Sequence, residues 1–557
     1  MTQAVNNDLP GAKARSDFRV LIVYPNLPLM LIPALAIALF TRVLREEGYQ
    51  VELFETTHYL DQEEDSSSEN RVKMLNVREF SVTEDLGITI KHDMFGDFRR
   101  KVESFRPDLM IFSVVEDAFL QALALLRRVQ DLNIPHVFGG VFPTNAKERC
   151  FDFPEIKMIA LGEGERTVVD VAEAVRQGKA IDTIAGTWSR LPDGTIRKNP
   201  VQPLADINRY RPDFSLFEES RFYRPMGGRV FKMIPVETYR GCPYSCTYCN
   251  SPAQRVFSKD NELGNFLRRK RMDVLRAELT EHYAAYKPTF FYFVDDSFLA
   301  RPRQEIFDFC DMYEEFRLPF WFNTRAENCD AKALARLKEV GCYRISFGIE
   351  CGNEEYRQRV LRRKITNAEM IDRFAMIADS GIAFSLNLIV GMPGETRELV
   401  MDTVDLVRSV HGYDALTVSI FTPYHGTVLR DVAVKNGWLD PQTITRHTTA
   451  RSILTMPAPF LSADDIDGLA AVMPLYCYFP KSEWPALRRA EGSDAEGLAI
   501  RERYAEIYRK NFFGETQDSR KTFLVEGGTG CRTNPKDAFR LSPKRLSADE
   551  IAMLSMG

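Results

Sequence analysis

The first third of the chain alternates short apolar runs with amphipathic stretches. Five runs have the length and residue types of buried strands, at 19–23, 51–54, 109–113, 136–140 and 157–161. Apolar residues at helical spacing separate several of them, over about 27–47, 96–105 and 117–131. Strands that alternate with helices predict right-handed crossovers and a parallel, doubly wound α/β sheet. We therefore expect one Rossmann-like domain over 17–180, with ligands at the carboxyl ends of its strands.

A second alternation of the same kind begins near residue 233. Its strands are expected at 234–238, 290–294, 320–323, 344–347, 384–390 and 416–421, and its helices at 271–286, 303–315, 331–340, 354–361, 366–380 and 397–410. Six β/α units predict a partial TIM barrel over 233–430, with its chemistry at the carboxyl ends of the strands. We expect a disordered tail over 1–16, a linker over 181–232, and a mostly helical, charged domain over 431–557 that closes over a substrate.

Composition places the chain among ordinary globular proteins. A length of 557 residues suggests roughly two to four domains, and fractions of 45% hydrophobic and 27% charged residues are typical of a soluble fold. The formal net charge of −5 gives no reason to expect nucleic acid. The most apolar stretch, 27–40, is too short to span a bilayer and lacks the features of a signal peptide. We expect a cytoplasmic protein without a membrane partner.

Three of the ten cysteines stand together on one short segment. Cys242, Cys246 and Cys249 have the spacing CxxxCxxC, and the other seven are scattered singly, which fits a reducing compartment. A structural zinc site would need a fourth ligand, and no second cysteine pair lies nearby. A cubane iron–sulfur cluster that only transfers electrons also takes four cysteines. Three thiolates would leave one iron open to a substrate; this interpretation is favoured, with zinc or unligated thiols as the alternatives.

This segment and the strand ends after it resemble the radical S-adenosylmethionine (SAM) superfamily. The cysteine motif follows an Arg-Gly dipeptide, and later strands end in VDDSF (294–298), GIE (348–350) and GMPGET (391–396). The resemblance covers nearly all of 233–430. It implies a [4Fe–4S] cluster whose open iron binds SAM, and an electron donor such as flavodoxin or ferredoxin. In that family, an electron from the cluster cleaves SAM to a 5′-deoxyadenosyl radical.

The resemblance also implies a set of SAM-binding residues. They are Tyr248, Asp296, Arg325, Glu350, Asn387 and Gly391. Asp296 corresponds to the region near the SAM amino group, and Glu350 to a position that supports the methionine and ribose. Asn387 resembles a ribose contact, and Gly391 begins the turn beside the adenine. For single residues a structural role is the alternative: a helix cap or solvated loop for Asp296, and a surface ion pair for Arg325.

The N-terminal domain resembles the cobalamin-binding domain of one large branch of this superfamily. The matching residues follow the strand ends and are Tyr24, Pro25, Asn26, Ser113, Gly139, Gly140, Phe142, Thr144, Gly162 and Glu163. The two adjacent glycines would let the backbone approach a bulky flat ligand. A nucleotide-binding module is the competing interpretation, weakened because no GxGxxG follows the first strand. The Asp-x-His-x-x-Gly loop of many cobalamin domains is absent, so this resemblance implies no imidazole on cobalt.

Taken together, these resemblances imply an enzyme. The favoured activity is a cobalamin-dependent radical SAM methyltransferase that moves a methyl group from methylcobalamin to an unactivated carbon of a small-molecule substrate. A ring-closing, ring-rearranging or oxidising enzyme would use the same domains and stays open, as does a cobalamin-binding sensor or carrier without catalysis. His425 replaces a proline in the sequence after the sixth barrel strand and is a candidate substrate contact.

Overall fold

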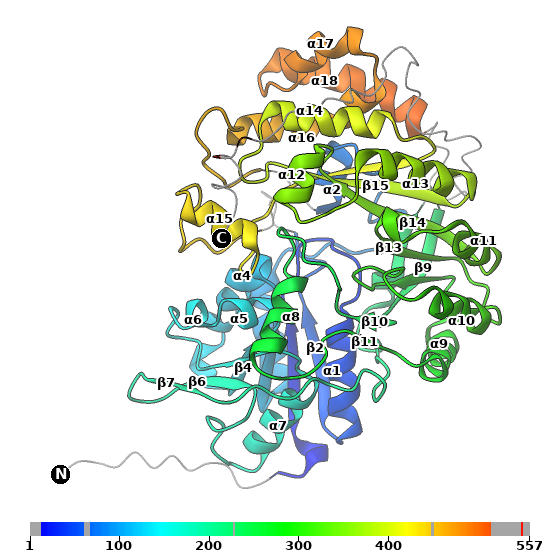
Figure 1. Ribbon diagram of the computed structural model, residues 1–557. Coiled ribbons are helices and arrows are strands. Elements are labelled where there is room, and N and C mark those ends of the chain that lie inside the picture. Colours follow the sequence, from blue (N-terminus) through cyan, green and yellow to red (C-terminus); the bar gives the residue numbers. More distant parts are fainter. Residues whose placement is uncertain are drawn as a thin grey trace. The chain divides into compact units, whose positions relative to one another are not determined.

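The computed structural model describes residues 13–60, 67–226, 229–446 and 451–513, together with Ser547 and Asp549. The chain divides into two compact units (Figure 1). Unit 1 comprises Met1–Glu63, Ile90–Glu218 and Val256–Phe266, and unit 2 comprises Glu64–Thr89, Glu219–Arg255 and Leu267–Gly557. Two segments therefore leave the unit of their sequence neighbours: Glu64–Thr89 joins unit 2, and Val256–Phe266 joins unit 1.

Unit 1 is built on a sheet of the order β2-β1-β3-β4-β5-β6-β7. Its strands are β1 (Arg19–Tyr24), β2 (Gln50–Glu55), β3 (Leu109–Ser113), β4 (His136–Gly139), β5 (Met158–Ala160), β6 (Thr187–Arg190) and β7 (Ile196–Lys198). The first five are parallel, and β6 and β7 are antiparallel. The order 2-1-3-4-5 reverses between β1 and β3, where doubly wound sheets bind ligands. The predicted sheet is confirmed, and it continues through β6 and β7 into the expected linker.

Helices connect the parallel strands of unit 1. They are α1 (Leu35–Glu46), α3 (Met94–Phe105), α4 (Glu116–Arg127), α5 (Val141–Asn145), α6 (Lys147–Cys150) and α7 (Glu165–Arg176). Four consecutive residues are buried in β1 and four in β3. Because side chains alternate between the faces of a strand, uninterrupted burial shows that both faces of the sheet are covered.

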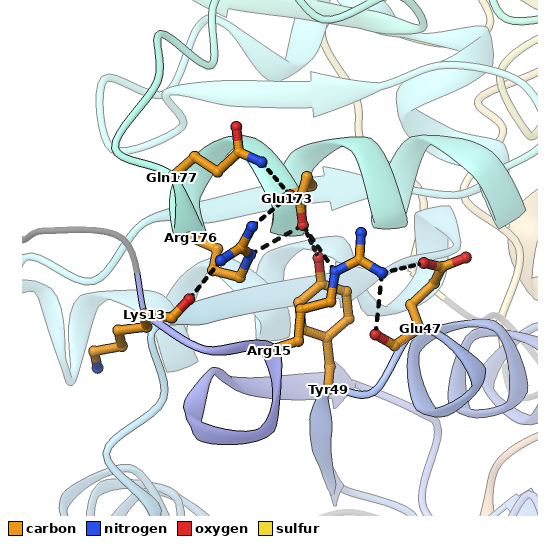
Figure 2. Close-up of polar contacts among 7 residues, drawn as sticks. All are labelled: Lys13, Arg15, Glu47, Tyr49, Glu173, Arg176 and Gln177. Atoms are coloured by element: carbon orange, nitrogen blue, oxygen red, sulfur yellow. Dashed lines mark hydrogen bonds and ion pairs between the residues drawn. The ribbon is translucent and has the colours of Figure 1, made fainter.

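The N-terminal end of unit 1 is tied to the rest of the unit by charged side chains. Residues 1–12 of the expected tail lie outside the described residues. Arg15 donates from Nη1 to Glu47 Oε2 (2.6 Å) and from Nε to Glu173 Oε2 (3.2 Å), as Figure 2 shows. Glu173 also accepts hydrogen bonds from the hydroxyl of Tyr49 (2.6 Å) and from Nη2 of Arg176 (2.6 Å). Residues directly after the undescribed segment therefore belong to the folded unit.

Unit 2 contains a curved sheet of the order β16-β15-β14-β13-β12-β9-β8 (Figure 1). Its strands are β8 (Tyr223–Met226), β9 (Arg229–Val236), β12 (Phe290–Phe293), β13 (Phe320–Thr324), β14 (Cys342–Glu350), β15 (Ala383–Val390) and β16 (Ala415–Ile420). The strands from β9 to β16 are parallel, and β8 is antiparallel to β9. The predicted partial barrel of six β/α units is confirmed, and β8 extends it at one edge.

Helices cover the outer face of this sheet. They are α9 (Met272–Tyr286), α10 (Arg303–Tyr313), α11 (Ala331–Glu339), α12 (Glu354–Arg359), α13 (Asn367–Asp379) and α14 (Arg397–Arg408). Phe293 of β12 and Phe320 of β13 pack against Phe309 of α10, with ring centroids 5.1 and 5.9 Å apart. The neighbouring residues Tyr292 and Trp321 therefore point to the opposite, inner face of the sheet.

The described part of the segment that joins unit 2, residues 67–89, reaches one edge of the barrel sheet. It carries α2 (Ser67–Lys73) and then Asn76, whose side-chain Nδ2 donates to the carbonyl oxygen of Val418 (2.9 Å). The backbone nitrogen of Val418 donates in return to Asn76 Oδ1 (2.8 Å). One side-chain amide thus pairs with edge strand β16 as a neighbouring strand would, and it satisfies backbone groups that an open sheet leaves unpaired.

The segment after β16 is helical, as expected, over the residues that the structure describes. Its helices are α15 (Val428–Lys435), α16 (Ala463–Tyr478), α17 (Trp484–Ala490) and α18 (Ala495–Tyr508). Most of the expected C-terminal domain after residue 513 lies outside the described residues. None of the helices described has both the length and the apolar character needed to cross a membrane.

Candidate functional site

The three clustered cysteines lie on the loop between β10 (Tyr239–Arg240) and α8 (Ser251–Asp260), beyond the carboxyl end of β9. All three are partly buried. The backbone nitrogen of Ser251 donates to Sγ of Cys249 (3.4 Å). Burial raises the pKa of Cys242 to about 11 and that of Cys249 to about 12. These thiols therefore need a cationic partner, such as iron, to ionise at neutral pH.

The cysteine loop is held in shape by two side chains, one outside the motif and one within it. Arg255 of α8 donates from Nη1 to the carbonyl oxygens of Cys242 (3.2 Å) and Pro243 (2.6 Å). Thr247, inside the motif, donates from its hydroxyl to the carbonyl oxygen of Val360 (2.7 Å). The loop is thus preformed, which favours binding of a group that makes several bonds at once.

The donor set fits an iron–sulfur cluster. Among the described residues, no three His, Cys, Asp or Glu side chains converge as the ligands of a single metal ion do. A cubane cluster does not require its ligands to converge on one point, because each thiolate binds a different iron and the cysteine sulfur atoms stay apart. Three soft thiolates on one preformed loop are the ligands that such clusters take in proteins.

The two adjacent aspartates after β12 make different contacts. Asp295 is buried; it accepts a hydrogen bond from the backbone nitrogen of Thr238 (2.7 Å) and pairs with Arg301 (2.5 Å). Asp296 faces the cysteine loop, since the hydroxyl of Ser251 donates to its Oδ2 (2.7 Å). Burial raises the pKa of Asp295. The pKa of Asp296, an exposed residue, is also raised, by partial desolvation and then by repulsion from Asp295. Only Asp296 of this pair contacts the residues that follow the cysteines.

Tyr248 and Glu350, both predicted to bind SAM, form one hydrogen-bonded group. The Tyr248 hydroxyl donates to Glu350 Oε1 (3.2 Å), and Arg363 Nη1 lies 3.3 Å from the same oxygen. Burial raises the pKa of Glu350, and the charge of Arg363 opposes this. Glu350 has a φ of 66°, where β14 shifts register against β15; such strain is typical of functional positions.

Arg363 is a member of this group that the sequence did not reveal. It belongs to a Leu-Arg-Arg-Lys run in which the preceding residue, Arg362, is exposed. Arg363 is buried and also donates from Nη2 to the carbonyl oxygen of Gly348 (2.7 Å). Nothing in the local pattern distinguishes these two arginines.

The remaining predicted SAM residues lie on the same sheet or beside the cysteine loop. Asn387 pairs in register with Gly348 of β14. Arg325 lies with its guanidinium 3.8 Å from the ring centroid of Tyr244, a residue of the cysteine loop. Arg325 also pairs with Glu327 (2.8 Å), so the ion pair considered for it is present, although Arg325 itself is buried.

The turn at Gly391 is shaped by a buried carboxyl group. Gly391 has a φ of 85°, and a Cβ there would lie 2.7 Å from Cγ2 of Ile466, so glycine is required. Glu395 Oε2 accepts hydrogen bonds from the backbone nitrogens of Gly391 (2.6 Å) and Met392 (3.2 Å). Burial raises the pKa of Glu395 to about 8.

The residues predicted for cobalamin lie along one edge of the unit 1 sheet. Tyr24, Ser113 and Gly139 end β1, β3 and β4, and Gly162 follows β5. Because these strands are parallel, their carboxyl ends share an edge. Gly140 has a φ of 118°, and a Cβ there would lie 2.3 Å from the carbonyl oxygen of Val114. The glycine is therefore required by a backbone crossing as well as suited to a flat ligand.

Several side chains of this set are already bonded within unit 1. Asn26 donates from Nδ2 to the carbonyl oxygen of Met30 (2.9 Å). Thr144 accepts from the backbone nitrogen of Gly162 (3.0 Å), and Glu163 accepts from that of Ala205 (2.6 Å). The buried members of the set include Pro25 and Phe142. These residues hold the loops at the sheet edge, and their direct contact with cobalamin stays a prediction.

His425 lies in the connection between β16 and α15 and is partly buried. Its role as a substrate contact stays a prediction.

The chain contains a radical SAM domain, because residues 236–407 match the family model of the Radical SAM superfamily. An uncharacterised methyltransferase of Pyrococcus horikoshii is 25% identical over 368 residues, which cover 65% of this chain and 77% of that protein. An anaerobic magnesium-protoporphyrin IX monomethyl ester cyclase of Rubrivivax gelatinosus is also 25% identical, over 338 residues and 58% of each chain.

Two solved structures share the fold. TsrM of Kitasatospora setae, a radical SAM methyltransferase with cobalamin and a [4Fe–4S] cluster bound, has a TM-score of 0.57 at 16% identity and covers 88% of this chain and 99% of that one. OxsB, a cobalamin-dependent SAM radical enzyme with aqua-cobalamin and SAM bound, has a TM-score of 0.60 at 15% identity and covers 91% and 74%. The predicted architecture of a Rossmann-like sheet and a radical SAM barrel is thus confirmed as a fold.

Proposed function

We propose that this chain is a cobalamin-dependent radical SAM methyltransferase that transfers a methyl group to an unactivated carbon of a small molecule. The observation that carries the proposal is a preformed loop with three thiols at the carboxyl end of a barrel, in a chain that also folds a 2-1-3-4-5 sheet. The fold shared with TsrM and the relative named as a methyltransferase support it.

The residues of unit 2 have separate tasks in this proposal. Cys242, Cys246 and Cys249 hold the cluster, which with SAM supplies a 5′-deoxyadenosyl radical while cobalamin supplies the methyl group. Asp296, turned toward the cysteine loop by Ser251, offers a carboxylate to the cationic amino group of SAM. The Tyr248–Glu350–Arg363 group and the Gly391 turn hold the rest of SAM in place.

Unit 1 contributes an edge for cobalamin at the carboxyl ends of its parallel strands. The backbone of Gly139 and Gly140 lies there without side chains, beside Ser113. The bonds of Asn26, Thr144 and Glu163 fix the loops around this edge. An external flavodoxin or ferredoxin delivers the electron.

A ring-forming or oxidising enzyme is the second candidate. The relative named as a magnesium-protoporphyrin ester cyclase favours it, because that protein matches this chain at the same identity as the methyltransferase does. The two reactions differ in what happens to SAM. Methyl transfer consumes a second SAM and yields S-adenosylhomocysteine, whereas radical formation alone yields 5′-deoxyadenosine.

The test is an anaerobic incubation of the reconstituted protein with SAM, methylcobalamin, a reductant and a cell extract. We expect S-adenosylhomocysteine, 5′-deoxyadenosine and a product heavier by one methylene group in the mass spectrum. Formation of 5′-deoxyadenosine alone would favour the second candidate. Cys246→Ala should lose bound iron and both products, whereas Cys310→Ala, a buried lone cysteine of α10, should keep them.

A further inference from the structure

Two arginines of unit 2 are partly buried and have no acidic partner among the described residues. Arg71 lies on α2 and Arg224 on β8. Nη1 of Arg224 is shielded from solvent and has no hydrogen-bond partner. Across the described part of the chain, neither guanidinium forms an ion pair, and no carboxylate acts on the charge of either one.

The ladder of β8 and β9 places Arg224 on the inner face of the barrel sheet. Arg224 lies opposite Phe231 in this ladder, so both side chains share a face. The ring of Phe231 packs against Phe290 of β12, with centroids 4.9 Å apart. Phe293 faces outward, so Phe290 and Tyr292 of the same strand face inward. Phe231 and Arg224 therefore face inward as well. Tyr292 is close enough that its hydroxyl affects the charge of Arg224.

The inner face near Arg224 is aromatic and polar, and it also carries Arg229 and Arg344. The rings of Tyr292 and Trp321 stack with centroids 4.0 Å apart. Asn323 donates from Nδ2 to the Tyr292 hydroxyl (2.8 Å), and Trp321 donates from Nε1 to the hydroxyl of Ser346 (2.8 Å). Barrel interiors are ordinarily filled by branched apolar side chains. This one presents flat rings and hydrogen-bonding groups, which suits a bound organic molecule.

Another arginine of the same sheet shows what a structural arginine does here. Arg344 of β14 is buried and forms a two-pronged ion pair with Asp414. Arg71 and Arg224 lack such a partner in the part of the chain that the structure describes, and desolvation lowers the pKa of each. The charge of Arg71 adds to this effect on Arg224, whose pKa falls to about 10. Arginine side chains stay protonated at neutral pH, so two like charges act on one another here with no compensating carboxylate among the described residues.

We propose that Arg71 and Arg224 bind an anionic group of the substrate, a carboxylate or a phosphate, on the inner face of the barrel. A guanidinium binds either group with paired, charge-assisted hydrogen bonds. The inference rests on the proposed function and names the substrate class for that same barrel. The inference also assigns a function to the segment Glu64–Thr89, because this segment brings Arg71 from the first part of the sequence into unit 2.

The experiment measures anion binding by the full chain, with inorganic phosphate and sodium acetate as probes against sodium chloride at equal ionic strength. Thermal unfolding and calorimetric titration follow the wild type, Arg71→Gln and Arg224→Gln. Arg303→Gln is the matched control, since Arg303 is exposed and paired with Asp330. We expect at least one anion to stabilise the wild type and the control, and the apparent affinity to fall about tenfold or more in the other two variants. Preference between the two anions distinguishes a phosphorylated from a carboxylated substrate.

In chloride alone, Arg224→Gln should unfold at or above the wild-type temperature, because the substitution removes an uncompensated charge. A lower temperature would make the arginine a structural residue and overturn the inference. An equal anion response in all variants would place the anion elsewhere, and no response in the wild type would also refute the proposal. The same preparations are assayed for SAM cleavage and methyl transfer. If those persist without anion binding, this inference alone fails; if anions bind at the arginines but no methylated product forms, the proposed function fails.

Discussion

The edge of the barrel sheet offers a sharp test, because one side chain satisfies two backbone groups there. Asn76 is 4% exposed and Val418 1% exposed. Replacing Asn76 with alanine leaves the nitrogen and the carbonyl oxygen of Val418 buried and unpaired. Each such group costs about 1–3 kcal/mol, so Asn76→Ala should lower the free energy of unfolding of unit 2 by about 2–6 kcal/mol.

Hydrogen exchange is the suitable assay, because a chain of two units need not unfold in one step. The amide of Val418 should exchange much faster in Asn76→Ala, whereas amides of the central strand β13 should change less. Asn76→Asp separates the two bonds, since it keeps the acceptor for the Val418 nitrogen but removes the donor to its carbonyl oxygen. Asn436→Ala, which removes a local bond within α15, is the control. Unchanged protection of Val418 in Asn76→Ala would refute the assignment of this segment to the sheet edge.

Four further substitutions probe the loops around the barrel. Burial raises the pKa of Glu395 from 4.5 to about 8, so between these pH values the folded state keeps a proton that the unfolded chain loses. The free energy of unfolding should therefore fall as pH rises from about 4.5 to 8. Glu395→Gln should flatten this slope in denaturant titrations, and an unchanged slope would contradict the assignment. Asp295→Asn should lower the free energy of unfolding by about 3–5 kcal/mol in thermal unfolding, because it leaves the buried Arg301 side chain without its carboxylate. Asp296→Asn should change stability by no more than about 1 kcal/mol but weaken SAM binding in equilibrium dialysis. Equal SAM affinity in Asp296→Asn would show that this residue is not part of the SAM site. Gly391→Ala should cost about 1–3 kcal/mol or more, from backbone strain and the contact with Ile466, and a stable variant with unchanged SAM binding would show that the turn can relax.

Secondary structure was predictable here because the periodicity of apolar residues is strong. The strands expected at 109–113 and 384–390 are β3 (Leu109–Ser113) and β15 (Ala383–Val390). Tertiary placement was not predictable in the same way. The sequence shows 58–95 only as a charged insertion after the second strand, and nothing local indicates that Asn76 pairs with a strand more than three hundred residues later.

The site shows the same division between local and tertiary information. The cysteine spacing and the GIE and GMPGE sequences are local, so they could be found along the chain. Arg363 is buried beside exposed Arg362, and Arg71 and Arg224 have no acidic partner among the described residues. Both features depend on which elements pack around these arginines. Whether an arginine lacks an acidic partner depends on its surroundings in the folded chain, so it cannot be read from a sequence that contains many arginines.

The aspartate pair after β12 marks the boundary between these two kinds of information. Side chains alternate along an extended chain, so two neighbouring carboxylates at a strand end should point to different sides. This alternation explains why one of them can serve the fold while the other can serve a ligand. Arg301 and Thr238 decide these roles, because both bind Asp295. Asp296 is left to contact Ser251, next to the cysteine loop. An arginine six residues after the first carboxylate was visible in the sequence, and its pairing with that carboxylate is the signal that would have assigned the two roles in advance.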